Sequence, residues 1–264
     1  MLTRFVTLQG YTLAAADGDI GKVREFYFDD QNWLVRYLVV DTGRWLMKRP
    51  VLIIPEVLTE ADPQTNAIGV RLTKAAIRDA PSIDCDKPVS RQCENELHQY
   101  YQWRPYWAAP VASAWAAVSP SAIARAEERT AENVRATECR QAGADAHLRS
   151  SAELIARYSI QAIDGEIGRV YDFLIDDVEW QVRYLVVRCG SWLFGKDLLL
   201  APEWIECISS SDGKVLINLH RAALEDAPPF DANAGISRSF EQRVHEHYHR
   251  RRYWSIPQAA GGIA

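Results

Sequence analysis

The stretch 33–40 (WLVRYLVV) is almost continuously apolar, β-branched or aromatic, and Arg36 is its one charged residue. A run of this length and composition is typical of a β-strand that is buried on both faces. The polar residues of 29–32 come just before it and predict a turn. The stretch returns as 180–187 (WQVRYLVV), with Arg183 in the place of Arg36. The pattern therefore predicts one core strand that is used twice.

The repetition extends well beyond this strand. An ungapped comparison pairs Asp17 with Asp164, Gly21 with Gly168, Pro55 with Pro202, Pro81 with Pro228, and Trp107 with Trp254. The repeat is thus a complete folding unit, and we predict a first unit over 1–107, an Ala- and Pro-rich, partly helical linker over 108–151, and a second unit over 152–264. Because small units bury a limited share of their surface, we expect the two to pack together.

Within each unit the alternation and the turn residues predict short strands followed by a short helix. In the first unit the expected strands are Tyr11–Ala15, a strand from Ile20 to Phe28, Val35–Val40, Val51–Ile54 and Ala67–Leu72, with a helix over Thr73–Ala80. The fold class is therefore mainly β, with short accessory helices in both copies. Apolar residues on both faces near the end of the Ile20–Phe28 strand are typical of a strand that enters a closed barrel. We expect Arg36 to reach a carboxylate of the Asp29–Asp30 pair.

Each unit ends in an amphipathic segment. Apolar residues fall at helical spacing in both copies: Cys93, Leu97, Tyr100 and Tyr101 in the first, and Phe240, Val244, His247 and Tyr248 in the second. These segments predict helices that lie on their own unit or on the other one. In the linker, a capping serine, an early proline and many Ala, Glu and Arg residues predict a further helix over 119–143.

Composition narrows the function classes. The net charge of −5 and pI near 5.7 give no overall attraction for nucleic acid. The five cysteines form no Cys-x-x-Cys pair and do not recur between units, so we predict reduced thiols and no zinc site. The sequence has no dinucleotide-binding fingerprint, and we predict no cofactor. The first ten residues do not resemble a signal peptide, and the apolar run 106–118 is too short to span a bilayer. These observations predict a cytoplasmic protein without a transmembrane segment.

In several ordered motifs the chain resembles the PRC-barrel superfamily. They are Asp-Gly-(Asp/Glu)-Ile-Gly-(Lys/Arg)-Val, Asp-Asp-x-x-Trp-x-Val-Arg-Tyr-Leu-Val-Val, Gly-x-Trp-Leu before a Pro-Glu strand end, and a Tyr-Trp tail, over 11–107 and 159–254. The family includes the photosynthetic reaction-centre H subunit and the C-terminal domain of a ribosome-maturation factor, and the resemblance is strongest to bacterial proteins with two such barrels. It implies two tandem small, bent PRC-type antiparallel barrels, related by a pseudo-twofold, that serve as docking modules. The H subunit's membrane helix and the ribosome factor's extra barrel have no counterpart here.

Histidines in the second tail raise the question of a metal site. His245 and His249 are spaced so that a helix would present both on one face, as two metal ligands require. The first copy has His98 at the first position and Gln102 at the second, and no third ligand is placed nearby. We therefore favour a polar helix face over a metal site.

Two sequence motifs could indicate catalysis, but the residues around each of them do not fit that role. Gly190–Lys196 has phosphate-loop spacing, but Asp197 replaces the final Ser or Thr and a strand follows instead of a helix. The repeated pair Asp29–Asp30 (Asp176–Asp177) has no recurring nucleophile beside it, and we predict that these residues form a turn. We predict that the protein is not an enzyme.

The residues that differ between the copies are the candidate interaction residues. Trp103, Trp115 and Trp204 do not recur, and Arg250, Arg251 and Arg252 form a basic patch beside aromatic residues. We predict a non-catalytic interaction or adaptor module with an unidentified protein partner, and homo-oligomerisation is possible. The alternatives are an RNA- or ribosome-associated factor that binds through the basic tail, and a protein associated with a photosynthetic reaction centre or another membrane complex.

Overall fold

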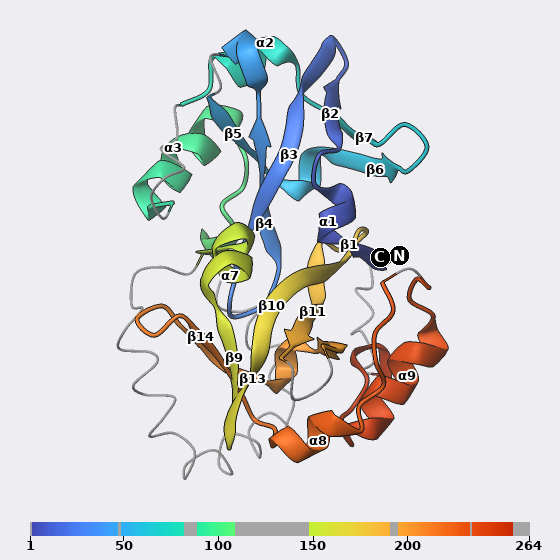
Figure 1. Ribbon diagram of the computed structural model, residues 1–264. Helices are drawn as coiled ribbons and strands as arrows, with labels where there is room; N and C mark the ends of the chain where they lie inside the picture. Colours follow the sequence, from blue (N-terminus) through green and yellow to red (C-terminus); the bar gives the residue numbers. More distant parts are fainter. Residues whose placement is uncertain are drawn as a thin grey trace, which may run out of the picture.

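The computed structural model describes residues 2–46, 49–81, 89–108, 148–190, 195–232 and 234–255. The chain is mainly β and forms two seven-stranded sheets, one built chiefly from each repeat, which lie end to end (Figure 1). The linker helix predicted over 119–143 lies outside the described residues.

Both sheets have the same strand order. The first sheet contains β5-β4-β3-β2-β7-β6 and the second contains β12-β11-β10-β9-β14-β13. The strands of the first are β2 (Thr12–Ala15), β3 (Gly18–Asp29), β4 (Val35–Asp41), β5 (Pro50–Ile53), β6 (Leu58–Asp62) and β7 (Ala67–Val70). Those of the second are β9 (Ser159–Ala162), β10 (Gly165–Asp176), β11 (Gln181–Cys189), β12 (Asp197–Leu200), β13 (Ile205–Ser209) and β14 (Lys214–Ile217).

Most of the predicted strands are confirmed, including the core strands β4 and β11. The sequence analysis missed β6 and β13, which pair with β7 and β14. Within the described residues the end strands of each order share no ladder, so neither sheet is closed into a barrel. The expectation of two closed barrels is therefore not confirmed, whereas a mainly β chain with two equivalent sheets is.

Each sheet is completed by a strand from the other repeat. Strand β1 (Leu2–Arg4) pairs with β10, and β8 (Leu148–Ser150) pairs with β3. The short helices α1 (Phe5–Leu8) and α7 (Ser151–Arg157) follow these strands and lie where the two sheets meet (Figure 1). The two repeats therefore exchange their first strands.

The two core strands begin side by side. Val35 N–H donates to the carbonyl of Trp180 and Val182 N–H to that of Trp33, both at 2.8 Å. The two tryptophans have positive φ, 59° and 51°, and both are buried. Equivalent residues thus exchange equivalent bonds, which places a pseudo-twofold axis between β4 and β11.

The repeated Asp-Gly motif has a structural explanation in both copies. The Asp17 carboxylate accepts from the N–H of Lys74 at 2.9 Å, at the start of α2 (Lys74–Arg78). Asp164 does the same for α8 (Arg221–Glu225). A Cβ on Gly21 would lie 2.0 Å from the carbonyl oxygen of Asp41, so only glycine allows β3 to approach β4 this closely.

The predicted tail helices are α3 (Arg91–Tyr101) and α9 (Arg238–His247), and each lies on its own repeat. The hydroxyls of Ser90 and Ser237 cap them by accepting the N–H three residues on, both at 3.2 Å. Leu97 of α3 packs with buried residues of β4 and β5. The structure thus settles which surface these amphipathic helices cover.

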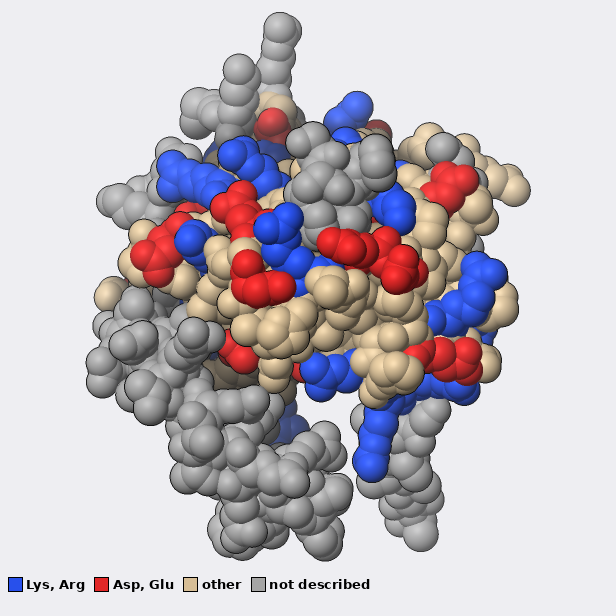
Figure 2. Space-filling model, turned by 60° about the horizontal axis from the view of Figure 1, so that its bottom comes forward, with Lys and Arg blue, Asp and Glu red and all other residues tan. Residues whose placement is uncertain are grey.

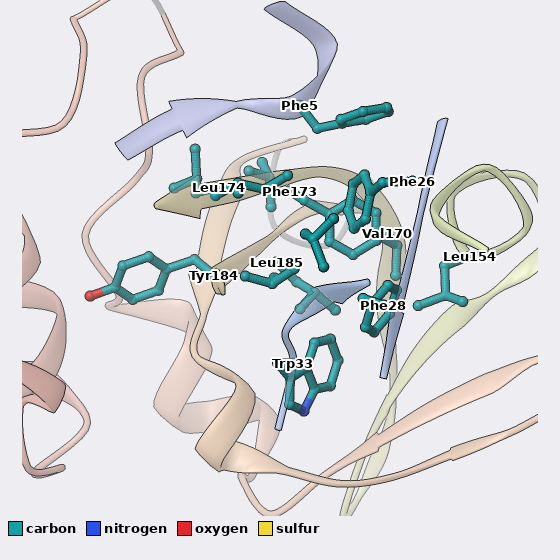
Figure 3. Packing of buried hydrophobic residues seen from close by; sticks show 14 of the residues in the cluster. Phe5, Phe26, Phe28, Trp33, Leu154, Val170, Phe173, Leu174, Tyr184 and Leu185 are labelled. Atoms are coloured by element: carbon teal, nitrogen blue, oxygen red, sulfur yellow. The ribbon is translucent and has the colours of Figure 1, made fainter. Parts of the chain in front are cut away.

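One hydrophobic core runs through both repeats. Phe26 and Phe28 of β3 pack on Phe173 of β10, with ring centroids 5.3 and 5.9 Å apart. Figure 3 shows these rings together with Phe5 and Trp33 at the junction. The expected packing of the two copies against each other is confirmed.

The cysteines depart in part from the prediction of reduced thiols. Cys93 and Cys189 are free, but Cys207 is disulfide-bonded. Spacing within the sequence gave no sign of this bond, because disulfide partners are brought together by the fold and not by their separation along the chain.

Candidate functional site: twin Tyr–Glu–His clusters

A tyrosine of each core strand binds a glutamate and a histidine of the tail helix that covers it. In the first repeat the Tyr37 hydroxyl donates to Glu94 Oε1 at 3.0 Å and lies 2.8 Å from His98 Nε2. All three side chains are buried, with 0–4% of their residues' surface exposed. Glu94 and His98 lie one helical turn apart on α3, so both face the strand.

The second repeat contains the same cluster. Tyr184 of β11 donates to Glu241 Oε2 at 3.2 Å and lies 2.9 Å from His245 Nε2. These residues are likewise buried, on β11 and α9. The repetition in three dimensions matches the repetition in sequence, residue by residue.

Further tyrosines and arginines close the first cluster. Tyr106 donates to Glu94 Oε1 at 2.8 Å, and Arg91 Nη1 lies 3.0 Å from Glu94 Oε2. The Arg36 guanidinium lies 4.1 Å above the Tyr106 ring and 2.6 Å from Asp29. The expected pairing of Arg36 with the Asp29–Asp30 turn is thus confirmed.

The second cluster is closed in the same way. Tyr253 donates to Glu241 Oε2 at 2.8 Å, Arg238 pairs with Glu241 at 3.2 Å, and Arg183 lies 4.3 Å above the Tyr253 ring. Arg238 also lies 4.4 Å above the ring of Trp254. The repeated Tyr-Trp end of each unit therefore folds back onto its own cluster.

Burial dominates the electrostatics of both clusters. It raises the pKa of Glu94 and of the Tyr37 and Tyr184 hydroxyls, and it lowers the pKa of His98 and His245. Each shift has the sign expected when a charged form leaves water. Neutral imidazoles and neutral phenols are therefore the favoured forms in the folded protein.

The hydrogen bonds fix the protonation of His245. Its Nδ1 lies 2.8 Å from the carbonyl oxygen of Arg251, which requires a proton on Nδ1. Nε2 of the neutral ring is then an acceptor, and it shares the single hydroxyl proton of Tyr184 with Glu241 Oε2. In the first repeat, Nδ1 of His98 has no hydrogen-bond partner within the described part of the chain.

A phenol, a carboxylate and an imidazole in mutual contact are groups that transfer protons in many active sites. Here they are buried and bonded to one another, and they occur twice with the same partners. Their direct consequence is mechanical, because they fasten each tail helix to its core strand. A second tie helps, since Tyr100 and His247 both bind carbonyl oxygens of the short helices α2 and α8.

The buried histidines predict a pH dependence of stability. As pH falls below about 6.5, the unfolded chain takes up protons that the folded chain, with its lowered histidine pKa values, does not. The free energy of unfolding, measured by chemical denaturation, should therefore decrease as the pH is lowered from about 7 to about 5. Glu94, whose pKa is raised, acts in the opposite direction at lower pH, where its protonation favours the folded state.

Substitution separates the histidine contribution. The double variant H98Q/H245Q should be less stable at pH 8 but lose most of this slope, whereas H220Q, at an exposed position, should keep it. An unchanged slope in the double variant would mean that other groups control the pH dependence.

The structure does not bring His245 and His249 together as metal ligands. Both ring nitrogens of His245 are used within the protein, and that residue is 1% exposed. His249 is exposed and has a φ of 53°, just beyond the end of α9. Among the residues described, no group of three or more metal-ligating side chains occurs. The sequence interpretation of a polar helix face also misses the burial of His245.

Trp103 and Trp204 occupy corresponding places from different parts of the chain. Trp103 stacks on Tyr101, with ring centroids 4.2 Å apart, and lies 5.9 Å from His98. In the second repeat Trp204 covers Tyr248 at 4.7 Å and lies 5.4 Å from His245. Trp204 is buried and Trp103 partly so.

The two tryptophans therefore replace each other in the fold. Val57 stands at the position of Trp204 in the first repeat, and Arg250 at the position of Trp103 in the second. Trp107 and Trp254, which do recur, also pack on His98 and His245, so each repeat has one further indole beside its histidine. That further indole comes from a different position in each repeat, which explains why neither Trp103 nor Trp204 recurs. Trp115 lies outside the described residues.

The basic tail follows α9. Arg250 donates to the carbonyl oxygen of Asn218 at 3.1 Å, and Arg252 lies 2.6 Å from Glu246. Arg250 and Arg251 are exposed and Arg252 is half-buried. In the face shown in Figure 2, Lys and Arg are interspersed with Asp and Glu.

Sequence reasoning missed the clusters although a signal was present. Ser, Glu and His recur at one spacing in both tails, as Ser90, Glu94 and His98, and as Ser237, Glu241 and His245. The recurrence marks the helix start and two residues on the buried face. The contact with Tyr37 and Tyr184 depends on the tertiary fold.

Comparison with known protein families and with curated proteins gave no match. The likeness to PRC-barrel proteins rests on the sequence motifs given above.

Proposed function

We propose that the protein is a non-catalytic interaction or adaptor module built from two PRC-type units. Its role is to present a rigid two-unit surface to a protein partner. The observation that carries this proposal is the duplication of the Tyr–Glu–His cluster. The side chains best suited to acid–base chemistry are buried in both repeats, where they hold a tail helix against a sheet. We therefore assign these repeated residues a structural role.

The rigidity of the scaffold supports the proposal. Exchanged strands, a shared core and two fastened tail helices leave few independent movements for the described elements. A preorganised surface loses less conformational entropy on binding, which suits a docking protein. No helix of the described residues is long and apolar enough to cross a membrane.

Affinity capture with the full chain as bait tests the proposal. We expect a protein partner that survives nuclease treatment and is recovered in constant ratio to the bait. The matched control is V178A, which alters an exposed side chain (79%) and should keep the partner unless Val178 lies in the interface. Failure to capture any partner above background, together with turnover of any substrate, would contradict the proposal.

RNA binding through the basic tail is the competing hypothesis. It predicts salt-dependent affinity that falls when Arg250, Arg251 and Arg252 are replaced by alanine, with a smaller salt slope. Because Arg250 and Arg252 already bind Asn218 and Glu246, we expect weak binding and at most a small change in a filter or fluorescence assay. A large, salt-dependent loss in the triple variant would favour RNA over the protein partner.

A further inference from the structure

Each repeat begins with an arm that leaves its own sheet. The first arm is Leu2–Leu8 (β1 and α1) and the second is Leu148–Arg157 (β8 and α7). Gly10 N–H still donates to the carbonyl of Val23 on β3, at 2.8 Å. Before this point the chain lies on β10 of the other repeat.

Each arm could pair with a strand of its own repeat instead. The part of β3 that pairs with β8, Tyr27–Asp29, lies just beyond Val23 on the same strand. The first arm would reach it by continuing along its own β3. The same holds for the second arm on β10. A folded-back form, in which each arm stays with its own repeat, is therefore compatible with the strand order.

The ladders show which arm residues correspond. Leu2 lies opposite Asp176 and Leu148 opposite the equivalent Asp29. Two residues further on, Arg4 and Ser150 therefore hold equivalent positions. Each of them meets a buried carboxylate, and these carboxylates are also equivalent: Asp172 on β10 for Arg4, and Glu25 on β3 for Ser150.

The first carboxylate has a cation of its own. Arg24 Nη2 lies 2.8 Å from Glu25 Oε1 within β3. The arm adds only neutral groups there, since the Ser150 hydroxyl donates to Glu25 and the Ser151 hydroxyl accepts from the N–H of Phe26. The Glu25 carboxylate is therefore paired with a cation of its own repeat, independently of the arm.

The second carboxylate receives its cation from the arm. Tyr171 stands where β3 has Arg24, and Arg4 Nε lies 2.9 Å from Asp172. Val6 N–H also donates to Asp172, at 3.1 Å. Asp172 is 1% exposed, and burial raises the pKa of its carboxyl group. Without Arg4 this carboxylate would be buried without a cation among its described contacts.

We propose that these two contacts are charge-matched latches that select the exchanged form over the folded-back form. In the folded-back form Arg4 would join Arg24 beside Glu25, which places two cations on one carboxylate. Ser150 would face Asp172, which would lack a cation. Of the two arrangements, only the exchanged one gives one cation to Glu25 and one to Asp172. The latches therefore make the two arms of one chain non-interchangeable.

A mutant cycle in the full chain tests the latch. R4S should lower the Tm by about 5–10 °C, since it leaves a buried carboxylate unpaired. Adding Y171R and D172E, which copies the Arg24–Glu25 arrangement into β10, should recover at least half of this loss. With Arg4 retained, Y171R/D172E should lower the Tm. S150A should cost less than R4S, because Glu25 keeps Arg24.

The proposal is overturned if the loss of Tm in R4S/Y171R/D172E equals the loss in R4S plus the loss in Y171R/D172E. It is also overturned if S150A lowers the Tm as much as R4S does. Should R4S fail to fold, recovery of soluble protein by Y171R/D172E becomes the readout, and its absence counts against the latch.

Cysteine crosslinking reports the position of the arm directly. L2C/D176C places cysteines opposite each other in the exchanged form, and L2C/D29C does so in the folded-back form. After mild oxidation and peptide mass spectrometry, the chain with Arg4 should give mainly the first crosslink. R4S should raise the share of the second. An equal ratio of the two crosslinks in both backgrounds would refute the selection.

Discussion

Replacing Phe173 with alanine is expected to lower the free energy of unfolding of the whole chain by about 3–5 kcal/mol. Phe173 is fully buried on β10 and contacts Phe26 and Phe28 of the other repeat. The cavity would therefore open in the shared core and not in one sheet. Urea denaturation followed by tryptophan fluorescence and circular dichroism measures the loss.

The expected form of that loss is as informative as its size. Because the core is continuous, both optical probes should shift together to lower urea and keep a single transition. V178A, at an exposed position, should change the free energy of unfolding by no more than about 0.5 kcal/mol. Separation of the F173A curve into two transitions would show that the repeats unfold independently.

Removing the Tyr184 hydroxyl should lower the free energy of unfolding by about 1–3 kcal/mol. In Y184F, Glu241 and His245 remain buried and each loses a hydrogen-bond partner. The fastening of α9 to β11 is weakened, so amide exchange in Arg238–His247 should become faster. Hydrogen exchange with mass spectrometry measures this, and α3 in the first repeat should be unaffected.

The twin cluster supplies the matched comparison. Y37F should have a similar cost but loosen α3 instead of α9. Y100F removes an exposed hydroxyl that binds a backbone carbonyl and should cost about 0.5 kcal/mol or less. If Y184F leaves both the stability and the exchange of α9 unchanged, the cluster is not the fastening that we describe.

Much of the fold was predictable because local pattern and repetition agree. Val35–Val40 predicted a strand buried on both faces, and β4 is such a strand. The Asp-Gly turn and the helix after it follow from residues that are close in sequence. The repeat then transferred each prediction to the second copy, so a mainly β chain with two equivalent units could be predicted without tertiary information.

The parts that the sequence did not predict depend on contacts between distant segments. Strands β6 and β13 have weak alternation, and their pairing partners define them. The arms escaped detection because Arg4 corresponds to Ser150, one residue out of the register that relates Tyr11 to Tyr158. An ungapped comparison therefore ends before the arms, and strand exchange leaves no local pattern.

The candidate site shows the same limit. Tyr37 looked like one more apolar residue of a core strand, and His98 like a polar residue of a helix face. Only their contact across 61 positions of sequence makes them a cluster. Conversely, the tryptophans that differ between the copies suggested a partner surface. In the fold, Trp103 and Trp204 fill equivalent spaces over the two histidines.

The central claim is that two repeats, joined by exchanged strands, form one interlocked scaffold. Native-state hydrogen exchange under increasing denaturant tests it most directly. The account predicts that the slowest amides of β3–β4 and of β10–β11 open with the same free energy and the same denaturant dependence. The account would be contradicted if the amide hydrogens of one strand pair exchanged with solvent through an opening in which the other strand pair stayed protected.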